Sequence, residues 1–255
     1  MGRQEMENET VIIIPARYGS RRLPGKPLIP IAGKPMIQWV YDRAREILQA
    51  SSVLIVTDDH RIAEAAEIFH ANVMMSPAEI SSGTERVGFA AQNMNANIVV
   101  NLQGDEPFVP VEAVGRAIDL LHDNPHLNVS TIACSLRSED EWRNPSIVKV
   151  LVDQDMNAIY FSRAMIPSFR DESFHPLPRL LKHIGVYVFR KKFLFQFLNW
   201  EESSLEKAEK LEQLRILEHG HKIGVVESEK SSFGVDTPED VAYIEKLIKE
   251  RGINL

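Results

Sequence analysis

The sequence predicts an α/β protein with a mostly parallel, doubly wound (Rossmann-like) sheet and a smaller antiparallel excursion in the second half. Short β-branched apolar runs alternate with amphipathic helical segments through the first half, as in right-handed βαβ units. The first run, residues 11–16, is apolar almost throughout, which is typical of a strand buried on both faces. From about residue 130 to 190, strand-like runs follow one another with few helical periods, which favours antiparallel pairing there.

The remaining elements are expected in the following order. Hydrophobic periodicity predicts further strands over residues 53–57, 73–75, 98–102, 129–136, 147–152, 159–161, 184–189 and 222–226. Helices are expected over residues 35–48, from residue 60 to 71, over 111–122, and from a Thr237 cap with Pro238 at the first helical position. Residues 201–212 are highly charged but carry leucines and an alanine at helical spacing, so we expect one helix with most charges on its solvated face. We expect residues 1–255 to form a single domain.

Composition excludes several classes of protein. The formal net charge of −7 over 255 residues argues against nonspecific binding to nucleic acid or to an anionic membrane. The single cysteine, Cys134, lies in an apolar run and is expected to be buried without an intrachain disulfide. We expect neither a membrane-spanning segment nor a signal peptide, and therefore a cytoplasmic protein.

Four cations lie within ten residues directly after the first strand: Arg17, Arg21, Arg22 and Lys26. Gly19, Ser20 and Gly25 stand between them, so backbone N–H groups and fixed cations can approach a polyphosphate together. The alternative is an ordinary solvated loop. It is not a Walker A loop, because five residues rather than four separate Gly19 from Gly25-Lys26, and Pro27 replaces the metal-binding hydroxyl residue.

Two aspartates lie at positions suited to binding a metal ion: one follows a predicted strand and the other precedes a predicted helix. Asp105 lies in NLQGDEP and Asp236 in GVDTPED. Mg²⁺ is typically held by one or two carboxylates together with substrate phosphates, so a magnesium site is expected; the alternatives are a turn residue and a helix cap. The segment SSGTER at residues 81–86 offers hydroxyls and N–H groups for a base or sugar and Arg86 for an anion, or else is an ordinary helix N-terminus.

Taken together, these motifs resemble the 3-deoxy-manno-octulosonate (Kdo) cytidylyltransferases. The resemblance runs from residue 11 to about 247 through PARYGSRRLPGKPL, TDD, SGTER, NLQGDEP, YFSRAMIP, KHIGVYVFR, LEKAEKLEQLR and GVDTPED, in this order. It implies transfer of CMP from CTP to the anomeric hydroxyl of Kdo with Mg²⁺, release of pyrophosphate, a homodimer, and a role in lipopolysaccharide synthesis. Residues 130–190 would then form the sugar-binding and dimerisation region.

The resemblance also implies residue roles. The nucleotide would be bound by Arg17, Ser20, Lys26, Ser82, Gly83 and Arg86. Catalysis would depend on Lys26, Arg17, Asp105 and Asp236, the two aspartates holding magnesium. The acidic sugar would be bound by Gln103, Arg163, His183, Tyr187, Glu212 and Gln213, with Arg163 and His183 as its cationic or donor partners.

Three alternatives remain at this point. The acceptor could be a related acidic sugar, such as 8-amino-Kdo or sialic acid, and Lys182 stands where an arginine is typical of the family. A cytidylyltransferase for methylerythritol phosphate would share the first loop but not the second-half motifs. A noncatalytic nucleotide-binding protein of the same fold is disfavoured because Lys26, Asp105 and Asp236 are all present.

Overall fold

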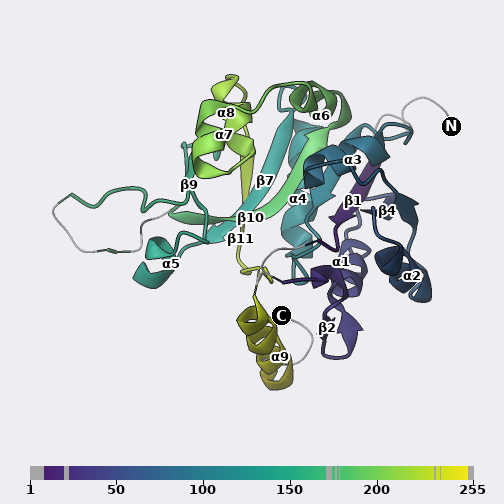
Figure 1. Ribbon diagram of the computed structural model, residues 1–255. Helices are drawn as coiled ribbons and strands as arrows, with labels where there is room; N and C mark the ends of the chain where they lie inside the picture. Colours follow the sequence, from purple (N-terminus) through teal and green to yellow (C-terminus); the bar gives the residue numbers. More distant parts are fainter. Residues whose placement is uncertain are drawn as a thin grey trace.

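The computed structural model describes residues 9–19, 23–170, 174–175, 177, 179–232, 234–235 and 237–251 (Figure 1). A central sheet runs through both halves of the chain in the order β11-β7-β10-β6-β1-β4-β5. Its strands are β1 (Thr10–Ala16), β4 (Ser52–Thr57), β5 (Val73–Met75), β6 (Ile98–Leu102), β7 (Val129–Ser135), β10 (Leu181–Arg190) and β11 (Gly224–Ser228). The predicted mostly parallel α/β fold is confirmed.

Helices cover both faces of this sheet. One core is formed with α1 (Met36–Ala44), α2 (His60–Ile68) and α4 (Val111–Asp123), and the other with α3 (Gly83–Ala91), α6 (Lys191–Leu198) and α8 (Gln213–Glu218). Strand β1 shows why: Ile12 and Ile14 belong to the first core while Val11 and Ile13 belong to the second. Because successive side chains point to opposite faces, a strand between two helical layers must be apolar at every position.

Strand β10 is the antiparallel member of the central sheet and lies in its middle. It pairs antiparallel with both β6 and β7, and its N-terminal end also pairs with β8 (Lys149–Val152). Strand β8 continues into a hairpin with β9 (Ala158–Ser162), while α5 (Glu139–Arg143) lies nearby (Figure 1). The predicted antiparallel region in the second half is therefore present, and its longest strand adjoins the end of β6.

Smaller elements flank the carboxyl edge of the first strands. A single 3-10 turn (Lys26–Leu28) is followed by β2 (Pro30–Ile31) and β3 (Lys34–Pro35), which pair with each other. The last helix, α9 (Pro238–Arg251), packs near this small hairpin. Its start is capped as predicted, since the Thr237 hydroxyl accepts from the Asp240 N–H at 3.3 Å and the Asp240 carboxylate accepts from the Thr237 N–H at 2.8 Å.

The prediction of one charged helix over residues 201–212 is wrong. The segment forms α7 (Ser204–Glu209), a turn at Lys210 with a positive φ of 55°, and then α8. Glu206 is not on a solvated face: it is buried and accepts two hydrogen bonds from the Arg215 guanidinium, at 2.7 and 2.6 Å. Periodicity alone could not distinguish a charge that faces water from one that is paired with a side chain of the next helix.

Two further observations bear on the sequence predictions. Cys134 is buried and free, as expected. Among the described residues, the helices are too short or too polar for any of them to cross a membrane.

Candidate active site

The loop after β1 and the end of β6 together line a pocket of about 300 Å³. Five of the predicted site residues line it: Arg17, Lys26, Gly83, Gln103 and Asp105. They converge because β1 and β6 are parallel neighbours, so their carboxyl ends open on the same edge of the sheet. The predicted grouping of the cationic loop with Asp105 is therefore present in the structure.

Lys26 and Asp105 make direct contact in this pocket. The Lys26 Nζ lies 2.7 Å from Asp105 Oδ2, and the lysine is buried while the aspartate side chain is 40% exposed. Gly25, with a φ of 68°, turns the backbone just before Lys26, and its Cα faces the Tyr18 ring so closely that a Cβ would lie 3.1 Å from it. The loop thus places an ammonium group at the base of the pocket with one carboxylate beside it.

Arg17 is the second described cation of the pocket. Burial and the nearby Arg86 charge lower the pKa of Arg17 from its usual value, while Asp58 and Glu85 act in the opposite direction. Ser20, Arg21 and Arg22 of the same loop lie outside the described residues.

The start of α3 forms one wall of the pocket. The Ser82 hydroxyl caps the helix by accepting from the Glu85 N–H, and the Glu85 carboxylate reaches back to the Ser82 N–H, both at 3.0 Å. Burial alone would raise the pKa of Glu85, but the hydrogen bonds from Ser82 and Ser81 outweigh it and the pKa is lowered. The segment SSGTER is therefore an ordinary capped helix N-terminus, and it also contributes Gly83 to the lining of the pocket.

Arg86 does not line the pocket. Its side chain is fully buried, and its guanidinium bonds to Asp58 at 2.9 Å, to the Ser76 hydroxyl and to the Ile80 carbonyl at 3.4 Å. These contacts tie α3 to the ends of β4 and β5. Within this structure Arg86 is a support for the pocket wall, whereas the resemblance had implied a nucleotide contact.

The residues expected to bind the sugar lie on neighbouring elements. Tyr187 on β10 is in register with Asn101 on β6, two residues before Gln103. Glu212 and Gln213 lie at the α7–α8 junction. Gln213 is buried, and among the described residues its Nε2 has no hydrogen-bond partner. Burial first, and then the Glu212 charge, raise the pKa of the Tyr187 phenol, so it is a neutral donor.

His183 is neutral in this structure. Its Nε2 lies 2.8 Å from the Thr131 hydroxyl, which donates its own proton to the Val186 carbonyl at 2.6 Å. Because that hydroxyl has one proton, it must accept from His183, and Nε2 carries the hydrogen. Burial lowers the pKa of His183 to about 3. Of the two roles expected for His183, the structure therefore supports a neutral ring and not a cation.

Arg163 follows β9 and is held by backbone groups. Its Nε donates to the Glu209 carbonyl at 3.0 Å and its Nη1 to the Pro145 carbonyl at 3.1 Å, while its own N–H donates to the Glu209 carboxylate at 2.9 Å. A guanidinium with two sides already occupied is oriented by the chain itself. Asp236, the second expected metal ligand, lies outside the described residues.

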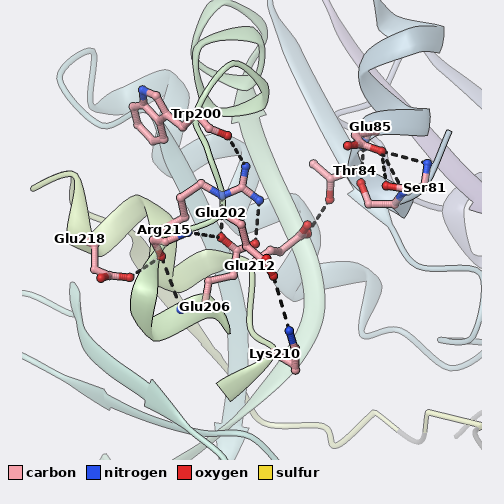
Figure 2. Close-up of polar contacts among 12 residues, drawn as sticks. Ser81, Thr84, Glu85, Trp200, Glu202, Glu206, Lys210, Glu212, Arg215 and Glu218 are labelled. Atoms are coloured by element: carbon pink, nitrogen blue, oxygen red, sulfur yellow. Dashed lines mark hydrogen bonds and ion pairs between the residues drawn. The ribbon is translucent and has the colours of Figure 1, made fainter. Parts of the chain in front are cut away.

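A second pocket, of about 390 Å³, lies on the other side of the α3 start, between it and the α6–α8 region. Figure 2 shows the Arg215 guanidinium donating hydrogen bonds to Glu206 and to the Trp200 carbonyl. It also shows Thr84 pointing from α3 toward Glu212. Burial raises the pKa of Glu212, and its hydrogen bond from Thr84 opposes this. Glu212 thus faces this second pocket, while Gln103 lines the first.

Sequence reasoning missed Thr84, Asn101 and Glu106. Asn101 was the detectable one, since an amide inside the otherwise apolar run of residues 98–102 is unusual for a buried strand. Glu106 accepts from the Ser232 hydroxyl; burial and then the adjacent Asp105 raise its pKa to about 7. Its oxygens also lie against Gly185 and Gly234, where a Cβ would come within 3.6 and 3.5 Å, so it joins the ends of three chain segments.

Known proteins resemble this chain in sequence and in fold. A family model described as cytidylyltransferase matches residues 11–223. The chain is 45% identical to the 3-deoxy-manno-octulosonate cytidylyltransferase of Pelobacter propionicus, covering 90% of this chain and 93% of that protein. It is 44% identical to the 8-amino-3,8-dideoxy-manno-octulosonate cytidylyltransferase of Shewanella piezotolerans, covering 92% and 96%.

Among solved structures, a CMP:2-keto-3-deoxy-manno-octonic acid synthetase complexed with CTP superimposes with a TM-score of 0.88 at 40% identity, covering 95% of this chain and 99% of that one. The matches to the two curated relatives cover 90% and 92% of this chain, so they extend over both of its halves. The chain belongs to the 3-deoxy-manno-octulosonate cytidylyltransferase family.

Proposed function

We propose that this protein transfers CMP from CTP to the anomeric hydroxyl of 3-deoxy-manno-octulosonate and releases pyrophosphate. The observation that carries the proposal is the pocket in which Arg17, Lys26, Gly83, Gln103 and Asp105 meet, at the carboxyl edge of a doubly wound sheet. A pocket with two cations and a glycine at a helix start is suited to a triphosphate. The family membership supplies the cytosine base and the acidic sugar.

The reaction forms one bond and breaks one. The anomeric oxygen bonds to the α-phosphorus of CTP, and the bond from that phosphorus to the oxygen it shares with the β-phosphorus breaks. That oxygen leaves with pyrophosphate, and the hydroxyl proton passes to solvent water. Negative charge grows on the leaving pyrophosphate, and the Lys26 ammonium, buried at the pocket base, is placed to stabilise it. Arg17 offers planar donors to the other phosphate oxygens.

We also propose that Asp105 and Asp236 hold Mg²⁺. Asp105 fits, because it presents a carboxylate at the wall of the phosphate pocket and Mg²⁺ prefers one or two carboxylates with substrate phosphates. In the described part of the chain, no cluster of three or more His, Cys, Asp or Glu side chains could hold a metal ion. When bound, magnesium would neutralise phosphate charge and orient the triphosphate.

Three further assignments follow from the resemblance and are proposals: a homodimer, a cytoplasmic location and a role in lipopolysaccharide synthesis. The β8–β9 hairpin supports the dimer, because β9 pairs within the sheet with β8 alone among the described strands and carries Ile159 at 59% exposure. Such an edge strand is a natural surface for association. Sedimentation or light scattering of wild type and an Ile159→Lys variant would test this.

The activity is tested by pyrophosphate release with each of four nucleoside triphosphates and with Kdo, 8-amino-Kdo and sialic acid as acceptors. We expect turnover with CTP and Kdo, and a Mg²⁺ requirement. Asp105→Asn should lower kcat by about 10²-fold or more while the fold is kept, the scale for loss of one preorganised electrostatic group.

The chain offers a matched control for this variant. Asp42 forms a similar lysine–aspartate pair with Lys34 at 3.1 Å, on helix α1 away from the pocket, with a side-chain exposure of 38%. Asp42→Asn should leave turnover unchanged. Equal turnover of both variants at ordinary magnesium would refute the role of Asp105, and a preference for 8-amino-Kdo would reassign the acceptor.

A further inference from the structure

A row of buried polar side chains connects the phosphate pocket to the α7–α8 junction. Gln103 Nε2 lies 2.9 Å from Asn101 Oδ1, Asn101 Nδ2 lies 3.0 Å from Thr84 Oγ1, and Thr84 Oγ1 lies 2.5 Å from Glu212 Oε1. Asn101 and Thr84 are almost completely excluded from solvent. Figure 2 shows the last of these contacts, crossing from α3 to the α7–α8 junction. We call these four residues the polar row.

The chemistry of the row fixes its direction. A carboxylate only accepts hydrogen bonds, so the single Thr84 proton is used at Glu212. The Thr84 oxygen must then accept from Asn101, which turns the Asn101 NH₂ toward it. The Asn101 carbonyl faces the other way and can bond only to the NH₂ of Gln103. The Glu212 oxygen that accepts from Thr84 therefore orients two amides in sequence.

The consequence appears at the pocket. With its NH₂ engaged, Gln103 turns its carbonyl oxygen toward the start of α3, where a Cβ on Gly83 would lie 3.3 Å from Oε1. Gly83 and Gln103 both line the phosphate pocket. A glycine at this position leaves room beside that oxygen, and a carbonyl oxygen can bond only to a ligand group that donates.

We propose that Thr84 and Asn101 are positioning residues that hold the Gln103 amide as a hydrogen-bond acceptor, so that the site selects a substrate carrying a donor, a hydroxyl or amino group, at this point. The inference rests on the proposed function, because it concerns how that site discriminates its substrates. It assigns no chemistry to Thr84 or Asn101 themselves. The donor can come from the acceptor sugar or from the nucleotide, and the two substrates can be varied separately.

The first test compares Thr84→Val with Thr84→Ser. Valine keeps the shape of threonine and removes the hydroxyl, whereas serine keeps the hydroxyl and removes the methyl group. We expect Thr84→Val to raise the KM of one substrate about 3- to 10-fold, the scale of one hydrogen bond, with a smaller change in kcat, and Thr84→Ser to restore the wild-type KM. A rise in the KM of the sugar places the donor on the sugar, and a rise in the KM of CTP places it on the nucleotide.

The second test needs no variant that could fail to fold. Wild-type protein is assayed with sugar analogues in which one hydroxyl at a time is replaced by hydrogen or by fluorine, and with 2′- and 3′-deoxy and N4-dimethyl CTP. Fluorine accepts weakly but cannot donate. At the position that bonds to Gln103, replacing the hydroxyl by fluorine should therefore raise the KM as much as replacing it by hydrogen. In Thr84→Val the hydroxyl, fluoro and deoxy compounds should have similar KM values.

The outcomes separate this inference from the proposed function. Turnover of wild-type protein with CTP and an acidic sugar decides the proposed function by itself. With that turnover present, equal KM values for the valine and serine variants would overturn the assignment of Thr84 and Asn101 as positioning residues. The same conclusion would follow if every sugar analogue and every CTP analogue that lacks a donor had the KM of its parent compound.

Discussion

The neutral state of His183 makes a prediction about stability that can be worked out from its pKa. In the folded protein burial holds this pKa at about 3, against 6.5 for an ordinary histidine. Between these values the unfolded chain binds a proton that the folded protein does not. The contribution of His183 to the free energy of unfolding is therefore fully present above pH 6.5 and is lost as the pH falls toward 3.

The size of the loss at pH 5.5 depends only on the unfolded chain. A ring with a folded pKa near 3 is still neutral at pH 5.5, so the linkage reduces to RT ln(1 + 10), about 1.4 kcal/mol relative to pH 8. Because the His183 ring is only partly exposed and donates to Thr131, hydration stabilises its charged form only slightly.

The assay is urea unfolding at pH 8 and pH 5.5 of wild type and His183→Gln. Glutamine can donate to Thr131 but does not titrate, so the variant should lose about 1.4 kcal/mol less on acidification. An identical pH dependence in the two proteins would refute the reasoning. A wild type that becomes relatively more stable at pH 5.5 would show that His183 is a cation in the folded protein.

Two buried cationic side chains, Arg86 and Lys149, lead to further predictions about stability. Arg86→Met leaves Asp58 without its partner and should cost about 3–5 kcal/mol in urea unfolding, as for a broken buried ion pair, whereas Arg61→Met, which opens an exposed pair, should cost under about 1 kcal/mol. Similar costs would show that Arg86 is not structural. Lys149 is fully buried and donates to three backbone carbonyls, so Lys149→Met should lower the melting temperature, whereas Lys34→Met should not; equal melting temperatures would contradict this.

Local sequence patterns predicted the bounds of the first strands and the edge of the sheet at which the pocket lies. Strands β1, β4, β5 and β6 lie within a residue of their predicted bounds. For β1, β4 and β6 the reason is that a strand covered on both faces is a continuous apolar run. The closeness of Lys26 to Asp105 also followed, since the two come after parallel strands whose carboxyl ends share an edge.

The remaining parts depend on contacts between distant residues. The position of β10 depends on its pairing with β6 and β7, two strands that lie far from it in the sequence, and hydrophobic periodicity does not identify the partner of a strand. Likewise, nothing local distinguishes Arg86, buried against Asp58, from an arginine that meets a phosphate. The orientation of Gln103 depends on Glu212, more than a hundred residues later, so the amide in β6 was visible but its function was not.

The central position of β10 has a consequence for synthesis on the ribosome. Strands β5, β4, β1 and β6 come from the first 102 residues, so this parallel half can pair as soon as that part of the chain has emerged. The outer edge of β6 stays open until residue 190 has been made, and it carries Asn101, next to the phosphate pocket. The nascent protein therefore has the cationic loop long before it has the strand that completes the sheet beside it. Pulse-labelling hydrogen exchange should find β1 protected earlier than β10.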